Sequence, residues 1–165
     1  MVTIEPITPQ NASLFKAARL RALQGTPSAF GSTYAKESQL TEADWVTRAG
    51  VWNGERSILY LAMEAGAVVG IAGSHLDHEE ATQAHLISMW TAPTHRQHGI
   101  GHLLVNEILN WAHLRGASTL QLMVTSSNKS ATLFYQRLGF TFTGKTEPYP
   151  NDPALIEYQM SRPIP

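Results

Sequence analysis

The sequence predicts a mixed α/β fold in which a central sheet of about seven strands is flanked by about four helices. Strand-like runs of apolar residues recur along the 165-residue chain. Segments with apolar residues at helical spacing separate several of these runs, and glycine, proline and asparagine mark the boundaries. With 43% hydrophobic residues the chain is long enough for one well-buried core and short for two. We therefore expect a single domain over residues 1–165.

The first half of the chain predicts a strand, two helices and a β-hairpin. Thr8 and Pro9 favour a helix start because threonine caps a helix and proline suits its first turn. Thr41 marks a second helix start, and the small and polar residues between the two helices predict a loop or a broken helix. The expected elements are a strand at Val2–Ile7, a helix from Pro9 to about Leu23, the irregular stretch Ser28–Gln39, a helix after Thr41, and strands at Ser57–Glu64 and Ala67–Leu76 joined by Ala65-Gly66.

The second half alternates strands with helices and ends in two strands. Gly139 suits the left-handed position that closes a helix, with Phe140 as the hydrophobic residue after it. The expected elements are strands at Gln83–Trp90 and Thr119–Thr125, helices from Ile100 to about Gly116 and at Asn128–Leu138, closing strands at Phe140–Thr143 and Ala154–Met160, a loop at Glu147–Pro153, and a frayed end at Arg162–Pro165.

Composition excludes several classes of function. The formal net charge is −1 at pH 7, so no basic field indicates a nucleic-acid partner. The chain has no cysteine, which rules out disulfides, thiolate metal ligands and a cysteine nucleophile. The first residues do not resemble a signal peptide, and no apolar run is long enough to span a membrane. We expect a soluble cytoplasmic protein.

The stretch Leu86–Leu104 reads as a strand, a glycine-containing loop and a helix. Arg96, Gly99 and Gly101 form the pattern R-x-x-G-x-G between the strand and the helix. Glycines let the backbone turn and approach a ligand closely, and the first turn of a helix has unpaired N–H groups and the positive end of the helix dipole. The pattern therefore predicts an anion site. It is neither a Walker A motif nor a complete dinucleotide fingerprint.

This loop resembles the acyl-CoA pyrophosphate loop of the GNAT superfamily of N-acetyltransferases. A second pattern, Asn128-x-x-Ala131-x-x-Phe134-Tyr135 followed by Leu138-Gly139-Phe140, is similar to another signature of that family, in the same order along the chain. Leu20–Gly31 also resembles the substrate-side segment of many bacterial members. The resemblance implies a largely antiparallel mixed sheet and acetyl-CoA as co-substrate.

The resemblance also implies roles for individual residues. Backbone groups at Met89, Trp90 and Thr91 would meet the acetyl carbonyl and the pantetheine arm, while Tyr135 would be the general acid at the thioester sulfur. Many relatives have glycine and lysine where this chain has Gln97 and His98, which predicts weaker cofactor binding. The expected cofactor-binding residues are Met89, Trp90, Thr91, Arg96, Gln97, His98, Gly99, Ile100, Gly101, His102, Asn128 and Tyr135.

The general base and the acceptor site are less constrained. His85 is the expected base because a histidine is mostly neutral at pH 7, and Glu79 or Glu80 acting through water is the alternative. Analogy with the family places Phe30, Tyr34 and Tyr149 around the acceptor. His95, His98 and His102 raise a metal hypothesis, but no complete ligand motif accompanies them, so we expect no metal.

The predicted function is transfer of acetyl from acetyl-CoA to a primary amine of a small molecule, by direct attack in a ternary complex. The alternatives are a protein or peptide N-acetyltransferase, a non-catalytic acyl-CoA-binding sensor and a metal-binding domain. Exposed edge strands at the end of the chain are compatible with a homodimer.

Overall fold

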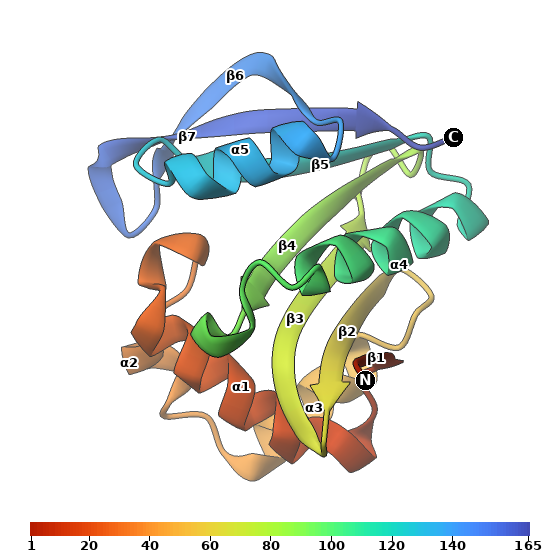
Figure 1. Ribbon diagram of the computed structural model, residues 1–165, viewed down its shortest axis with the longest axis vertical. Helices are drawn as coiled ribbons and strands as arrows, with labels where there is room; N and C mark the ends of the chain where they lie inside the picture. The colour runs from red at the N-terminus through yellow and green to blue at the C-terminus, as the bar shows by residue number, and fades with distance from the viewer.

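The computed structural model describes residues 1–165 and contains one seven-stranded sheet (Figure 1). The strand order is β1-β2-β3-β4-β5-β7-β6, and every neighbouring pair is antiparallel except β4 and β5, which are parallel. The predicted mixed, largely antiparallel sheet is therefore confirmed. The strands are β1 (Thr3–Pro6), β2 (Ser57–Glu64), β3 (Ala67–Leu76), β4 (Gln83–Thr91), β5 (Thr119–Thr125), β6 (Thr141–Tyr149) and β7 (Asp152–Pro163).

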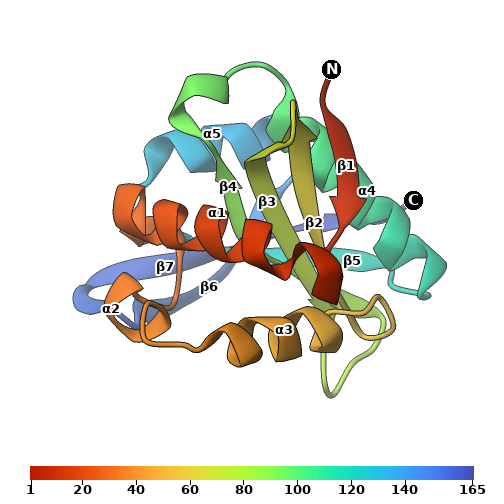
Figure 2. The ribbon, with the colours of Figure 1, turned by 90° about the horizontal axis from the view of Figure 1, so that it is seen from below.

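Helices cover both faces of the sheet (Figures 1 and 2). One buried cluster of apolar side chains packs α4 and α5 against the sheet, and a second packs α1 and α3 against the opposite face. The helices are α1 (Ala12–Gly25), α2 (Tyr34–Glu37), α3 (Glu42–Val51), α4 (Ile100–Leu114) and α5 (Lys129–Arg137), with 3₁₀ turns η1 (Pro9–Asn11), η2 (Pro27–Ala29) and η3 (Pro93–His95). The single turn α2 lies in the stretch predicted as a loop or a broken helix. No helix combines the length and the apolar character needed to cross a lipid bilayer.

The local signals in the sequence act as predicted. The hydroxyl of Thr41 accepts a hydrogen bond from the backbone N–H of Asp44, whose carboxylate accepts one from the backbone N–H of Thr41, so a capping box begins α3. Ala65 and Gly66 both have positive φ in the turn between β2 and β3. Gly139 has φ 91° directly after α5, which closes that helix.

The end of the chain is more regular than predicted. The expected loop at Glu147–Pro153 is wrong, because β6 continues to Tyr149 and β7 begins at Asp152. Pro148 is tolerated there because β6 is an edge strand, where a missing N–H need not break a ladder. The expected frayed end is also wrong, since β7 runs to Pro163 and the backbone N–H of Ile164 donates to the carbonyl of Ser118 at 2.8 Å.

Two irregularities in the sheet position the site. The parallel strands β4 and β5 pair only between Gln83–His85 and Thr119–Gln121, and beyond this joint they diverge (Figure 1). In the diverging part of β4, the register with β3 shifts between the pairs Ile71–Trp90 and Gly73–Ile87, which is a β-bulge. Ser88, inside the bulge, has φ 56°, in the left-handed region.

Candidate active site

A cleft of about 1130 Å³ opens where β4 and β5 diverge. It lies at the carboxyl ends of the two parallel strands, which is where open α/β sheets commonly bind ligands. Its walls come from the turn η2, the bulge of β4, the start of α4, the end of β5 and the inner side of α5. Residues predicted to bind the cofactor that line the cleft are Met89, Trp90, Thr91, Arg96, Gln97, Gly99, Ile100, Gly101, His102, Asn128 and Tyr135.

The predicted anion loop has the expected geometry. Gly99 has φ 81° and immediately precedes Ile100, the first residue of α4, so the unpaired N–H groups of the first turn lie at the cleft. The guanidinium of Arg96 is held across the mouth of the loop, where Nε donates to the carbonyl of Thr91 at 3.2 Å and Nη2 donates to the hydroxyl of Thr26 at 3.1 Å. The loop therefore combines helix-end donors with a positioned cation.

Gln97 is strained within this loop. Its φ is 64°, a conformation that glycine adopts freely and other L-residues adopt at a cost. We expect Gln97→Gly to raise the free energy of unfolding by about 0.5–1 kcal/mol. Glycine relieves the backbone strain in the folded state, and this gain exceeds the loss from the greater conformational entropy of the unfolded chain. Urea denaturation checks this expectation. Gln97→Ala is the matched control, because it removes the same side chain but keeps the Cβ. An equal gain from alanine would contradict the explanation by backbone strain.

Gly101 lies on the first turn of α4, where a larger residue has no room. A Cβ at this position would lie 2.8 Å from Cζ of Phe134 and 3.0 Å from Cε of Met89. Glycine at this position therefore lets the first turn of α4 pack closely against Phe134 and Met89 at the edge of the cleft.

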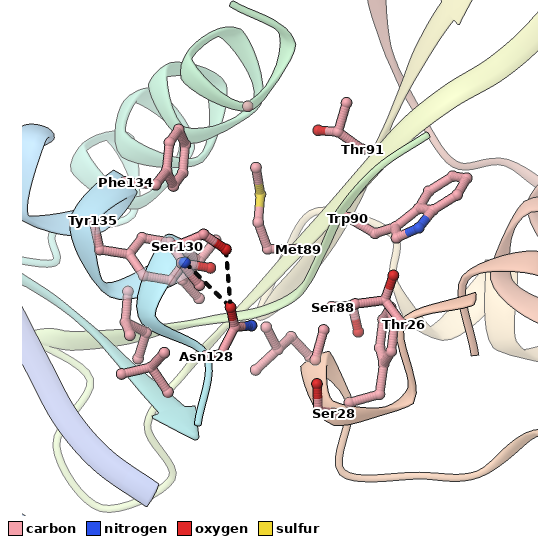
Figure 3. A pocket seen from close by; sticks show the side chains of 18 of the residues that line it. Thr26, Ser28, Ser88, Met89, Trp90, Thr91, Asn128, Ser130, Phe134 and Tyr135 are labelled. Carbon is pink, nitrogen blue, oxygen red and sulfur yellow. Dashed lines mark hydrogen bonds between the residues drawn. The ribbon is translucent and has the colours of Figure 1, made fainter. Parts of the chain in front are cut away.

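The bulge sends successive side chains of β4 in different directions. Figure 3 shows Met89 pointing toward Phe134 of α5, while Trp90 points to the other side of the strand. Trp90 is 4% exposed and packs in the core under α1, so its side chain is structural and its backbone borders the cleft. Ser88 and Met89 lie opposite Ala72 without a register partner, which leaves polar backbone groups available at the cleft.

Asn128 and Tyr135 lie together on the wall formed by α5. The Oδ1 of Asn128 caps α5, accepting from the backbone N–H of Ala131 at 3.2 Å and from the hydroxyl of Ser130 at 3.3 Å, and its Nδ2 donates to no protein atom (Figure 3). The ring of Tyr135 packs edge-on against Phe134 and Phe140. Burial raises the pKa of Tyr135, so the phenol remains protonated at neutral pH and able to donate.

His85 lines the cleft beside the β4–β5 joint, with one ring nitrogen already engaged. Its Nε2 lies 2.8 Å from Oδ2 of Asp77, and its ring stacks on His75 at a centroid distance of 4.8 Å. Glu79 and Glu80 do not line the cleft, and their backbone N–H groups donate to Oδ1 of Asp77. The role of His85 as base therefore stays a prediction, and this geometry gives it a fixed orientation. No group of three or more metal-ligating side chains is arranged to hold an ion.

Three predicted residues are not brought to the cleft, although Phe30 is. The side chain of Tyr149 is buried, and its hydroxyl donates to the carbonyl of Phe30 at 2.7 Å, so it fastens the β6–β7 turn to the segment after η2. Tyr34 begins α2 and is 39% exposed. His98 also lies outside the lining, while its neighbours Gln97 and Gly99 contribute to it.

Sequence reasoning missed several residues that line the cleft. Arg19 of α1, Ser88 of the bulge and Glu157 of β7 all border it. None belongs to a local motif, and they meet only through the sheet register and the packing of α1. The alternation of Leu155, Glu157 and Gln159 on one side of β7 is the only signal that could have indicated an inward-facing carboxylate.

Known proteins resemble parts of the chain and its whole fold. It is 45% identical over 53 residues to streptothricin acetyltransferase of Streptomyces lavendulae, covering 32% of this chain and 28% of that protein. It is 30% identical over 87 residues to the [ribosomal protein bS18]-alanine N-acetyltransferase of Escherichia coli K12, covering 53% and 57%. Its fold matches that of yncA from Salmonella typhimurium, solved with its cofactor acetyl-CoA, with a TM-score of 0.79 at 16% identity, covering 100% of this chain and 95% of that one.

The matched regions span between about a quarter and three fifths of these curated relatives. The model of the acetyltransferase (GNAT) family matches residues 20–140, which include the loop at Arg96–Gly101 and the α5 motif. The chain belongs to the GNAT acetyltransferase family.

Proposed function

We propose that the protein transfers acetyl from acetyl-CoA to a primary amine of a small molecule, by direct attack and without a covalent enzyme intermediate. The observation that carries this proposal is the convergence of the α4 N-terminus, the β4 bulge and the Tyr135 hydroxyl on one cleft. Acetyl-CoA bound to yncA, which shares the fold, and the acetyltransferase activity in the names of the two relatives support it.

The residues divide the work along the cleft. Arg96 and the amides at the start of α4 hold the pyrophosphate, where positive charge and free N–H groups coincide. The backbone of the bulge donates to the acetyl oxygen as negative charge develops there. Acetyl-CoA supplies a thioester, whose carbonyl carbon the amine attacks as the carbon–sulfur bond breaks. Tyr135 donates its proton to the departing sulfur, and His85 or water removes a proton from the attacking amine.

The position of Glu157 supports the proposal that the acceptor amine is cationic. Glu157 is the only carboxylate among the residues that line the cleft, and it forms no ion pair or hydrogen bond with another side chain. It lies opposite Thr125 in the β5–β7 register, so both side chains are on the same face of the sheet. The hydroxyl of Thr125 donates to the carbonyl of Ser28 at 3.0 Å, which places this face beside the turn η2. An ammonium group bound here would find an unneutralised negative charge.

We expect Glu157→Gln to raise KM for cationic amine acceptors by at least about tenfold, the effect of losing one charge-assisted hydrogen bond. Burial and then the neighbouring charge of Glu147 raise the pKa of Glu157 above the ordinary value for glutamate. Steady-state kinetics at saturating acetyl-CoA provide the measurement. Glu55→Gln is the matched control, because Glu55 is exposed, forms no ion pair and lies outside the cleft lining. Equal KM values in the two variants would contradict the assignment of Glu157.

A CoA-release assay tests the activity itself. We would compare small primary amines, including diamines and amino acids, with peptides that carry a free N-terminus, each at saturating acetyl-CoA. Release that depends on a small amine is expected. Release that depends only on peptides would move the acceptor to the protein class, as in the ribosomal-protein relative. Tight binding of acetyl-CoA with no amine-dependent release would favour a sensor.

A further inference from the structure

A buried ion cluster lies directly behind the β4 bulge. Glu37, the last residue of α2, is 2% exposed and binds two arginines from different helices. Nε and Nη2 of Arg19 donate to its two oxygens at 3.0 Å each, and Nη1 of Arg48 donates to Oε1 at 2.8 Å. Burial raises the pKa of Glu37, but hydrogen bonds from Arg19, Ser32 and Arg48 and the charge of Arg19 lower it overall to about 2. The carboxylate is therefore charged at every physiological pH.

Only one of the two arginine side chains reaches the cleft. Nη1 of Arg19 donates to the hydroxyl of Ser88 at 2.8 Å, and the guanidinium lies over the ring of Phe30 at 4.7 Å from its centroid. Arg19 lines the cleft, whereas Arg48 packs over Trp45 under the sheet and does not line it. The bidentate bond to Glu37 fixes the plane of the Arg19 guanidinium, so the direction of its third bond is fixed too.

Ser88 is the residue whose backbone needs such support. Its left-handed φ of 56° is unfavourable for serine, and the bulge has no register partner on β3 at this point. A strained backbone persists only when its surroundings hold it. The Ser88 hydroxyl has one hydrogen bond to another side chain, the bond from Arg19, and Arg19 is itself bound to a buried, permanently charged carboxylate.

We propose that Arg19 and Glu37 are positioning residues that hold the β4 bulge at Ser88 and so keep the adjacent backbone donors aimed at the reacting carbonyl. Arg19 acts through Ser88, and Glu37 acts through Arg19. The catalytic role of these backbone donors rests on the function proposed above. The mechanical link from α1 to the bulge does not depend on that function, so an experiment that measures no turnover can test it.

Three variants separate positioning from simple stabilisation. Arg19→Lys keeps the charge beside Glu37 but cannot bind Glu37 in two places and reach Ser88 as well. Ser88→Ala removes only the hydroxyl and leaves the ion cluster intact. Arg48→Lys is the matched control, because it perturbs the same carboxylate and has no contact with Ser88.

Two measurements decide the outcome. We expect Arg19→Lys and Ser88→Ala to lower kcat by roughly tenfold to a hundredfold without changing the Kd of CoA, and Arg48→Lys to leave kcat unchanged. Hydrogen exchange at the amides of Ile87 and Trp90, which flank the bulge, should be faster in the first two variants than in the third. Equal exchange in all three variants, or an unchanged kcat in Ser88→Ala, would overturn the proposal. A wild-type protein without any acetyl transfer would instead count against the proposed function, and the exchange measurement would still decide whether the bulge is held from α1.

Discussion

The stabilisation by acetyl-CoA is expected to disappear in Gly101→Glu. Acetyl-CoA at about 100 times its dissociation constant should stabilise the wild-type protein by about 2.7 kcal/mol and raise its melting temperature by roughly 5–10 °C. A glutamate at position 101 would place a carboxylate where the pyrophosphate is expected and would displace Phe134, whose Cζ lies 2.8 Å from the new Cβ. A thermal melt with and without the ligand measures both effects and needs no knowledge of the acceptor.

Gly50→Glu provides the matched control for this variant. Gly50 lies on α3, it is exposed, and an added Cβ would meet no atom within 4 Å. The same change in charge is made there without approaching the cleft, so the full shift should remain. A shift that survives in Gly101→Glu would show that acetyl-CoA binds away from the start of α4. No shift in the wild-type protein at millimolar acetyl-CoA would remove the basis of the proposed function.

Tyr135→Phe should lower kcat by about 10²–10⁴, the usual contribution of one general acid. The change removes a single oxygen and keeps the ring that packs between Phe134 and Phe140, so the fold and the affinity for acetyl-CoA should be preserved. Because burial raises the pKa of this phenol, its proton is present throughout the neutral pH range. The expected defect is therefore the same at pH 6.5 and pH 8.5. Stopped assays of CoA release at saturating amine give the measurement.

Tyr158→Phe is the control for the loss of a phenol. Tyr158 lies on β7, its side chain is partly exposed, and it packs against Phe142 rather than lining the cleft. Its substitution should leave kcat unchanged. An unchanged kcat in Tyr135→Phe as well would make Tyr135 a packing residue, and protonation of the leaving sulfur would then fall to water.

The sequence predicts the cofactor side of the cleft because that side is built from local chain geometry. Gly99 marks the point where the backbone turns, and Gly101 marks the point where a side chain has no space. Asn128 marks the start of α5. These signals depend on a few consecutive residues. They could be located without knowing how the sheet is assembled.

The acceptor side depends on residues that are distant in the sequence. Arg19 and Ser88 are 69 positions apart, and Thr125 meets Ser28 across 97. Analogy with the family predicts Tyr149 at the acceptor, but its hydroxyl donates instead to the carbonyls of Pro27 in η2 and of Phe30 directly after it. Glu157 reaches the cleft because β7 pairs with β5, although β6 separates the two in sequence. Local patterns contain no information on such pairings.

The short joint between β4 and β5 also bears on how the chain folds. Strands β2, β3 and β4 each pair with a sequence neighbour, and β6 pairs with β7, so these contacts close short loops and should form early. The parallel joint at Gln83–His85 must wait until α4 has crossed from one strand to the other. The joint forms few hydrogen bonds, and these must offset the entropy lost when the long connection between β4 and β5 becomes ordered. We therefore expect this joint to form late in refolding, and the cleft exists only once it is complete.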